Sequence, residues 1–351
     1  MPDAAFWRGR RVLLTGHTGF KGAWCMAWLR RMGAEVTGYS LAPETAPNLS
    51  RLLGLVDGGA SVLGDIRDAA GLAAVVARVR PQLVLHMAAQ ALVRRSYAAP
   101  LETFEINVQG TLRVLEALRG SPGLEAVLVV TSDKVYENDG SGRFFIETDR
   151  LGGSDPYSAS KAACEIATAS FARSFGGELG AVATARAGNV IGGGDWSADR
   201  IVPDLWRAQQ AGRPVSLRYP LATRPWQHVL EPIAGYLDFM EALALGLREP
   251  TLNFGPPDER PETVSAVAEA FQSAYGARGL GWEQAPGVHL KEAPTLAINA
   301  GRAAGLLPWR PRLSAAEAIT WTAQWYAAFD AGVDMAAFTA AQIAAYEDRL
   351  A

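Results

Sequence analysis

Tyr157 and Lys161 lie four residues apart within residues 156–175, a stretch whose composition and spacing predict a helix. Their spacing puts both side chains on one helical face. A phenol ionises near pH 10, which is about three units too high for a base at neutral pH, but a neighbouring ammonium favours the phenolate. Such a pair can take a proton from a hydroxyl group while a hydride leaves for a nicotinamide. Ser132, at the end of an earlier apolar run, is placed to hydrogen-bond the same hydroxyl.

A glycine-rich turn, TGHTGFKG, occupies residues 15–22. Gly16 permits a tight turn, Gly19 lets a diphosphate approach the backbone, and Gly22 lets the next helix pack close to the sheet. The N-terminus of that helix supplies N–H donors and a positive dipole end to an anion. The turn lies between a predicted strand and a predicted helix, so it predicts a dinucleotide site. The other residues expected at this cofactor are His17, Thr18 and Phe20.

The elements that carry these residues alternate between short apolar runs and longer helical patterns. Strands are predicted at residues 11–15, 35–41, 61–65, 83–88, 126–132 and 180–187, and helices at 20–32, 68–79, within 97–119 and at 156–175. Buried runs separated by helices indicate a parallel sheet covered on both faces. The predicted fold class is therefore α/β, a Rossmann-like doubly wound parallel sheet with its ligand crevice at the carboxyl ends of the strands.

The pattern changes after about residue 190, where helices dominate. Helices are predicted at 201–211, 231–247, 262–275, 314–330 and 336–350, and short strands at 215–217, 227–229 and 251–254. We expect residues 1–190 to form the dinucleotide-binding domain. Residues 191–351 would form mainly a smaller, mixed substrate domain, with the chain returning to the first domain at about residues 225–256.

Composition excludes several classes of protein. The 351 residues carry 33 basic and 36 acidic side chains, so no electrostatic footprint for nucleic acid or an anionic membrane is expected. No run of about 18 apolar residues predicts a membrane span, and the N-terminus lacks a signal-peptide pattern, so the default location is the cytoplasm. Cys25 and Cys164 form no CxxC pair, and the histidines are scattered. We therefore expect no metal site.

The residues that distinguish NAD from NADP are not obvious in the sequence. The second strand ends in Ser40 and Leu41, with neither the acidic residue that favours NAD nor the arginine that favours NADP. Asp65 and Ile66 follow the third strand and are expected at the cofactor, with Asp65 at the adenine edge. Asp65 could equally cap the helix that begins near Asp68.

Six motifs together resemble the extended short-chain dehydrogenase/reductase family, the NAD-dependent epimerases and dehydratases, over roughly residues 10–300. They are TGHTGFKG (15–22), GDIRD (64–68), HMAAQ (86–90), NVQGT (107–111), YSASK (157–161) and RAGNVIGGGDW (186–196). The resemblance implies NAD as the cofactor. It also implies further cofactor contacts at Ala88, Ala89, Gln90 and Asn107.

Within the family, the triplet Ser132-Asp133-Lys134 resembles the nucleotide-sugar 4,6-dehydratases that act on CDP-glucose, as do segments 92–97, 192–196 and 224–232. This likeness implies a hydro-lyase of deoxysugar biosynthesis. The sugar C4 would be oxidised, water lost across C5 and C6, and the hydride returned to C6, so that NAD is not consumed. One departure, Val135-Tyr136-Glu137 in place of Cys-Tyr-Asp, changes no ionisable role.

The same likeness assigns roles to the catalytic residues. Tyr157 would be the base at the C4 hydroxyl, Lys161 would bind the ribose and tune Tyr157, and Ser132 would position the hydroxyl. Asp133 would be the acid at the C6 oxygen. Lys134 would be either the C5 base, which requires a pKa lowered by desolvation or a nearby cation, or an electrostatic stabiliser of the enolate.

Contacts to the nucleotide sugar are implied by the resemblance, with the diphosphate suited to bidentate arginines. The residues concerned are Arg94, Asn189, Arg200, Arg224 and His228. Any single arginine is weak evidence, because the chain has 29 of them. The family's subunits pair through helices equivalent to residues 97–119 and 156–175, which implies a homodimer or a dimer of dimers.

Two other functions remain open. One is a related nucleotide-sugar enzyme, either a 4-epimerase or a dehydratase for another nucleotide. The other is a non-catalytic NAD(P)-binding regulator, since fold alone does not establish activity.

Overall fold

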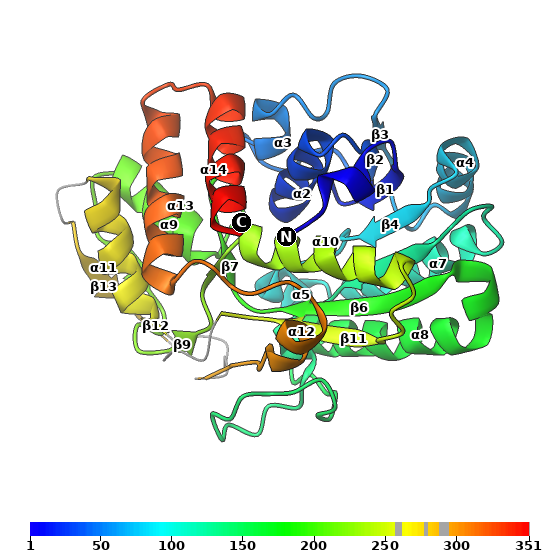
Figure 1. Cartoon of the computed structure of the whole chain (residues 1–351). Coiled ribbons are helices and arrows are strands. Elements are labelled where there is room, and N and C mark those ends of the chain that lie inside the picture. The colour runs from blue at the N-terminus through cyan, green and yellow to red at the C-terminus, as the bar shows by residue number, and fades with distance from the viewer. Residues whose placement is uncertain (257–261, 277–279, 288–294, 351) are drawn as a thin grey trace.

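A seven-stranded parallel sheet forms the centre of the molecule, in the order β11-β6-β5-β4-β1-β2-β3 (Figure 1). The computed structural model describes residues 1–256, 262–276, 280–287 and 295–350. The sheet strands are β1 (Arg11–Thr15), β2 (Glu35–Ser40), β3 (Ser61–Leu63), β4 (Leu83–His86), β5 (Ala126–Val130), β6 (Ala181–Ala187) and β11 (Thr251–Phe254). Strand order reverses between β1 and β4, so a crevice opens at their carboxyl ends. The predicted doubly wound α/β fold is confirmed.

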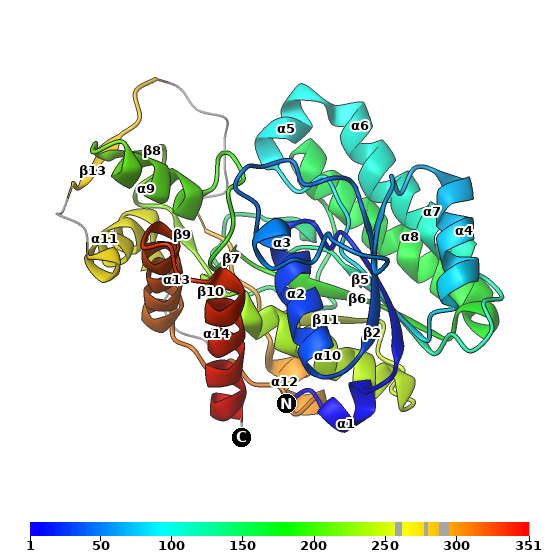
Figure 2. The same cartoon turned by 90° about the horizontal axis from the view of Figure 1, so that it is seen from above.

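Helices cover both faces of this sheet (Figure 2). One layer contains α2 (Phe20–Arg31), α10 (Leu230–Ala244) and α14 (Met335–Leu350), and the other contains α4 (Ala69–Val79), α7 (Thr111–Leu118) and α8 (Pro156–Leu179). Successive strand residues face opposite layers. Val12 and Leu14 accordingly belong to the core on the α2 side, whereas Leu13 belongs to the core on the α8 side.

Among the described residues, only one of these two cores contains tryptophan. Trp24, Trp28 and Trp309 are fully buried in the core that contains Val12 and Leu14. In the part of the chain that the structure describes, the core on the α8 side contains no tryptophan.

The predicted helix within residues 97–119 is present in a modified form. A continuous helical segment runs through α6 (Pro100–Phe104), a π-helical turn (Glu105–Gly110) and α7. Tyr97 belongs to a separate short helix, α5 (Val93–Ala98), because the chain turns at Ala99 before Pro100 opens α6. A π-turn inside a helix often marks a functional position.

The remaining chain builds a smaller unit beside the carboxyl ends of the strands. The elements that remain to be given, both in this unit and elsewhere, are α1 (Ala4–Trp7), α3 (Leu49–Leu52), a 3₁₀ turn (Asp133–Val135), β7 (Val190–Ile191), α9 (Ile201–Gln210), β8 (Val215–Leu217), β9 (Thr223–Arg224), β10 (Gln227–His228), β12 (Glu262–Thr263), α11 (Val264–Tyr275), β13 (Trp282–Gln284), α12 (Gly301–Leu306) and α13 (Ala315–Asp330). The predicted domain boundaries remain predictions. None of the helices in the described ranges has the length and apolar content to cross a bilayer.

Candidate active site

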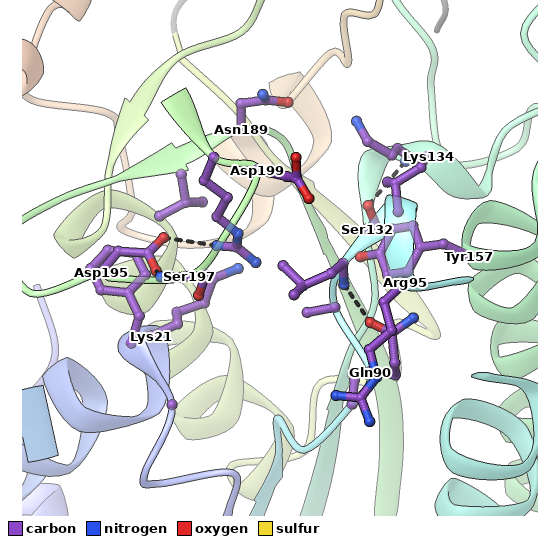
Figure 3. A pocket seen from close by; sticks show the side chains of 18 of the residues that line it. Lys21, Gln90, Arg95, Ser132, Lys134, Tyr157, Asn189, Asp195, Ser197 and Asp199 are labelled. Atoms are coloured by element: carbon purple, nitrogen blue, oxygen red, sulfur yellow. Dashed lines mark hydrogen bonds and ion pairs between the residues drawn. The ribbon is translucent and has the colours of Figure 1, made fainter. Parts of the chain in front are cut away.

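A cavity of about 1050 Å³ lies at the carboxyl ends of the strands, between the sheet and the smaller unit (Figure 3). It is at the upper end of the usual range for ligand pockets, roughly 300–1,000 Å³. Ser132, Lys134 and Tyr157 lie on one side of it, and Lys21 and Asp195 lie on the other. The cavity can therefore accommodate a cofactor and a second ligand together.

The glycine-rich turn forms one wall of the cavity and is built for close backbone approach. Gly16 has a φ of +80°, and a Cβ there would lie 2.7 Å from the Ala88 nitrogen. A Cβ on Gly22 would lie 2.1 Å from the Gly16 oxygen. Gly19 is the N-cap of α2 and makes no side-chain cap, so the first N–H groups of the helix face the cavity without a competing acceptor. This arrangement fits a diphosphate.

Thr18 and Phe20 line the cavity as predicted, but the prediction for His17 is wrong. The imidazole is fully buried behind the turn, where a Cβ on Gly38 would lie 2.2 Å from its Cγ. Its Nε2 is 2.7 Å from the Ser61 hydroxyl. Burial lowers the pKa of His17 to about 4, so the ring is neutral. It supports the turn from behind rather than contacting a phosphate.

Asp65 and Ile66 line the cavity, as do Ala88, Ala89 and Gln90. Asp65 is held by Arg67, with Nη2 and Oδ2 2.6 Å apart, and this hydrogen bond lowers the pKa of Asp65. The cap of α4 is Asp68, which accepts from the Ala70 N–H at 3.1 Å. The alternative role of Asp65 as a helix cap is therefore wrong.

Asn107 is buried and does not line the cavity, contrary to its prediction as a cofactor contact. Its Oδ1 accepts from the Gln90 N–H at 2.8 Å, and its Nδ2 donates to the Gln90 carbonyl at 3.1 Å and to the Ser160 hydroxyl at 2.9 Å. Asn107 thus fixes the cavity wall at Gln90 from behind.

Tyr157, Lys161 and Ser132 all line the cavity. Pro156 opens α8 and Asp155 caps it by accepting from the Ser158 N–H at 3.0 Å, which puts Tyr157 in the first turn. Lys161 donates to the Val130 carbonyl at 3.1 Å, at the end of β5. Burial lowers the pKa of the Lys161 ammonium.

The pKa of Tyr157 is raised, not lowered as expected from Lys161. Burial is the main cause, while the Ser132 hydroxyl and the positive charge of Arg200 act in the opposite direction. The phenol is therefore protonated in the protein alone. A cationic nicotinamide ring is the group that could favour the phenolate further.

Asp133 and Lys134 follow Ser132 in a 3₁₀ turn that the Ser132 hydroxyl caps. Asp133 Oδ1 accepts from the Ser132 hydroxyl at 3.1 Å and lies 3.8 Å from the Lys134 ammonium. Asp133 is 2% exposed, and its Oδ2 has no hydrogen-bond partner within the described residues. A buried carboxylate oxygen without a partner is costly, so this atom points to a ligand group.

Four of the five residues predicted to bind the nucleotide sugar line the cavity: Arg94, Asn189, Arg200 and Arg224. Arg200 pairs with Asp195 at 3.2 Å, and Arg94 pairs with Asp199 at 3.1 Å. Arg224 is 7% exposed in the short strand β9.

The prediction for His228 is wrong. Its ring is fully buried between Trp24 and Trp321, with centroids 5.8 and 5.7 Å away. Burial lowers the pKa of His228 to about 3. The residue is therefore an uncharged part of the core.

Lys21 is one of the cavity-lining residues that the sequence prediction did not assign to the site. It lines the cavity, and burial and the charges of Arg200 and Lys161 lower its pKa to about 7, against the opposite effect of Asp133. Its place inside the glycine-rich turn was the available signal. Among the described residues, no group of three or more His, Cys, Asp or Glu side chains is arranged to hold a metal.

The doubly wound sheet, the phosphate-binding turn and the buried serine–tyrosine–lysine group define a dinucleotide-dependent enzyme of the short-chain dehydrogenase/reductase class. More specifically, the chain belongs to the NAD dependent epimerase/dehydratase family, which matches residues 12–255. NAD is therefore the cofactor, and the turn and cavity fit it.

Similar proteins agree with this assignment. The chain is 40% identical to a CDP-glucose 4,6-dehydratase of Salmonella typhimurium, over 99% of this chain and 98% of that one. An epimerase structure from Methanothermobacter thermautotrophicus superposes with a TM-score of 0.82 at 22% identity, covering 93% and 95% of the two chains. A dTDP-glucose 4,6-dehydratase structure from Streptomyces venezuelae, with NAD bound, gives a TM-score of 0.78 at 24% identity over 92% and 98%.

Proposed function

We propose that this enzyme converts CDP-glucose to CDP-4-keto-6-deoxyglucose and water. The observation that carries the proposal is the unpartnered Oδ2 of Asp133, next to Lys134 and in the same cavity as Tyr157. Oxidation alone needs only the Ser132–Tyr157–Lys161 group. An additional buried acid and a neighbouring amine are what a dehydration also requires.

Tyr157 takes the proton of the sugar C4 hydroxyl, and Ser132 holds that hydroxyl in place. The glycine-rich turn would hold NAD, which would supply the hydride acceptor for C4 and the hydride donor for C6. Lys161 stays at the base of the site, tied to the Val130 carbonyl. From there its ammonium group would donate to a ribose hydroxyl of the bound cofactor and would favour the phenolate of Tyr157 during proton transfer, against the effect of burial.

The C4 ketone makes the C5 proton acidic, and Lys134 is proposed to remove it. Asp133 gives a proton to the C6 hydroxyl, which leaves as water. A proton then returns to C5 as C6 receives the hydride, so the net change is loss of one water. Lys134 is 27% exposed at 3.8 Å from Asp133, which is compatible with proton transfer on the open side of the site.

Arg224, Arg200 and Arg94 are proposed to bind the diphosphate, with Asn189 beside it. Arginine suits this task through its fork of donors. The cytidine base is supported by the 40% identity to the Salmonella enzyme rather than by a particular contact.

A homodimer is also proposed, through α6 and α8. These helices pack side by side, and each exposes a large apolar residue. Leu101 is 85% exposed and Ile166 is 60% exposed. A second copy of the same face would cover them.

The test is incubation of the enzyme and NAD with CDP-, dTDP-, UDP- and GDP-hexoses, followed by mass and 4-keto assays. CDP-glucose should lose one water and give a 4-keto product. Dehydration of a different nucleotide sugar would refute the cytidine assignment. A C4 epimer of unchanged mass would indicate an epimerase, and NAD binding with no turnover of any sugar would indicate a non-catalytic binder.

A further inference from the structure

Glu165 and Arg186 form a buried ion pair directly behind the catalytic triplet. Both side chains are 4% exposed. Arg186 donates from Nη2 to Oε2 at 2.9 Å and from Nε to Oε1 at 3.0 Å, so the contact is a two-point fork. Neither residue lines the cavity.

The pair contacts both ends of the segment that carries the triplet. At one end, the Thr131 hydroxyl donates to Glu165 Oε1. At the other end, Arg186 Nη1 donates to the Tyr136 hydroxyl at 2.8 Å, and that hydroxyl donates to Asn253 Oδ1 at 2.7 Å. Ser132, Asp133 and Lys134 lie between these two anchors.

Glu165 also ties the segment to the catalytic helix. Tyr157, Lys161 and Glu165 follow one another at intervals of four along α8, so they share one face of it. Arg186 stands on β6, the strand next to β5. The ion pair therefore links the helix that carries Tyr157 to the turn that carries Asp133.

Stability alone does not account for this arrangement. Desolvation offsets much of the attraction in a buried ion pair, and well-packed apolar residues of similar volume often stabilise a core equally well. Apolar residues could not hold the hydroxyls of Thr131 and Tyr136.

We propose that Glu165 and Arg186 are positioning residues that hold Asp133 and Lys134 in register with Tyr157. This inference rests on the proposed function. Tyr157 is in the capped first turn of the 24-residue helix α8, whereas Asp133 and Lys134 sit on a short turn held at its two ends. Loosening the anchors therefore impairs the loss of water more than the oxidation at C4.

Such a loosened enzyme has a distinct chemical signature. Oxidation at C4 without loss of water would leave one hydride, that is two electrons and one proton, on the cofactor, and the hydroxyl proton on Tyr157. A 4-keto sugar that retains its C6 hydroxyl then accumulates together with an equal amount of reduced NAD. A general loss of folded enzyme would lower all products in proportion.

The test uses Thr131→Val and Tyr136→Phe, which remove one anchoring hydroxyl each. Each variant should lower kcat for dehydration by roughly tenfold, since small displacements of catalytic groups are costly, with KM for the sugar nearly unchanged. Reduced NAD and the undehydrated 4-keto sugar should appear. Hydrogen–deuterium exchange should increase at the amides of residues 131–136.

Tyr346→Phe is the matched control, because it removes a buried tyrosine hydroxyl that donates to a carboxylate, Glu231, at 2.7 Å outside the site. Its product ratio should equal that of the wild type. The double variant Glu165→Leu/Arg186→Met removes the pair without leaving a lone buried charge, and it should show the same shift in product ratio.

The proposal would be overturned if Thr131→Val and Tyr136→Phe gave the product ratio of the wild type and unchanged hydrogen–deuterium exchange at residues 131–136. So would a fully active double variant. If the wild-type enzyme does not dehydrate CDP-glucose, the proposed function fails. The exchange comparison with Tyr346→Phe then still decides whether the pair holds the segment.

Discussion

Asp133 combines deep burial with one oxygen that has no partner in the described protein. Its other oxygen is held by the Ser132 hydroxyl. The carboxyl group is therefore oriented before any ligand arrives, and orientation of this kind accounts for much of the efficiency of acid catalysis. In the proposed mechanism Asp133 acts only in the loss of water, because the oxidation at C4 does not use it.

Asp133→Asn tests that separation. The amide keeps the shape and the bond to Ser132 but cannot give up a proton in the same way, so dehydration should fall by roughly 10²–10⁴-fold. Rapid mixing of enzyme, NAD and CDP-glucose should still produce reduced NAD at a rate close to that of the wild type. Tyr157→Phe is the comparison and should produce neither reduced NAD nor dehydrated sugar. Normal dehydration by Asp133→Asn would contradict the acid role.

The residues whose place in the cavity could be predicted are those whose positions follow from local spacing. Tyr157 and Lys161 share a helix face whatever surrounds it, and the glycine-rich turn encodes its own geometry. His17 and His228 were assigned wrongly because the direction of a side chain depends on distant packing partners. His17 turns into the space left by Gly38, and His228 turns into a slot between two tryptophans.

At the level of elements, the π-helical turn before α7 directs Asn107 towards the back of the cavity wall. This turn was not predicted from the sequence, because the one-residue shift that it makes in the apolar spacing is confined to the six residues Glu105–Gly110. The buried strands were predictable because continuous apolar runs between turns have few other solutions. The break between α5 and α6 was not predicted, because a single residue, Pro100, causes it.

Asn107→Ala tests the role of this turn. It leaves both backbone groups of Gln90 without their partner, so the free energy of unfolding should fall by about 2 kcal/mol in urea titrations. NAD affinity, measured by calorimetry, should weaken because the wall at Gln90 is less ordered. Asn299→Ala, which removes an exposed hydrogen bond from the Gly301 N–H to the Asn299 side chain, serves as the control. Equal effects of the two substitutions would contradict a specific role for Asn107.

Helix α10 carries a fully buried carboxyl group, Glu231, away from the active site. Burial raises the pKa of Glu231 to about 7, although the Tyr346 hydroxyl and the N–H groups of Arg312 and Leu313 act in the other direction. The folded protein therefore binds this proton more tightly than the unfolded chain does. Its contribution to stability is present at low pH and is lost as the pH rises to about 7.

Glu231→Gln should flatten that dependence. The difference in Tm between about pH 5 and about pH 8 should be smaller than in the wild type, because the amide does not titrate. The pKa of Glu317 is shifted in the opposite direction, because its hydrogen bond with Arg349 lowers that pKa to about 2. The contribution of Glu317 is lost only as the pH falls towards that value. An unchanged slope in Glu231→Gln would contradict the assignment.

The molecule as a whole presents an apolar face on α6 and α8, and Ile166→Glu tests whether a second copy covers it. A charge at this position should convert the dimer to a monomer in light scattering, because an unpaired charge in an interface is costly. Leu245→Glu is the control, since Leu245 is 78% exposed at the end of α10. A monomeric wild type, or an unchanged dimer in Ile166→Glu, would contradict the proposed interface.

Because only one of the two cores contains tryptophan, tryptophan fluorescence follows the unfolding of only one side of the sheet. Indole emission comes from the core on the α2 side and from Trp282 on β13, which is 36% exposed, and the described α8-side core contributes none. The helix layer that carries Tyr157, Lys161 and the proposed dimer face therefore contributes no tryptophan signal to thermal unfolding followed by fluorescence. Unfolding of this layer alone would not be detected by that measurement. Replacing Phe171 or Phe175, which pack against that core, with tryptophan would give this layer a reporter of its own.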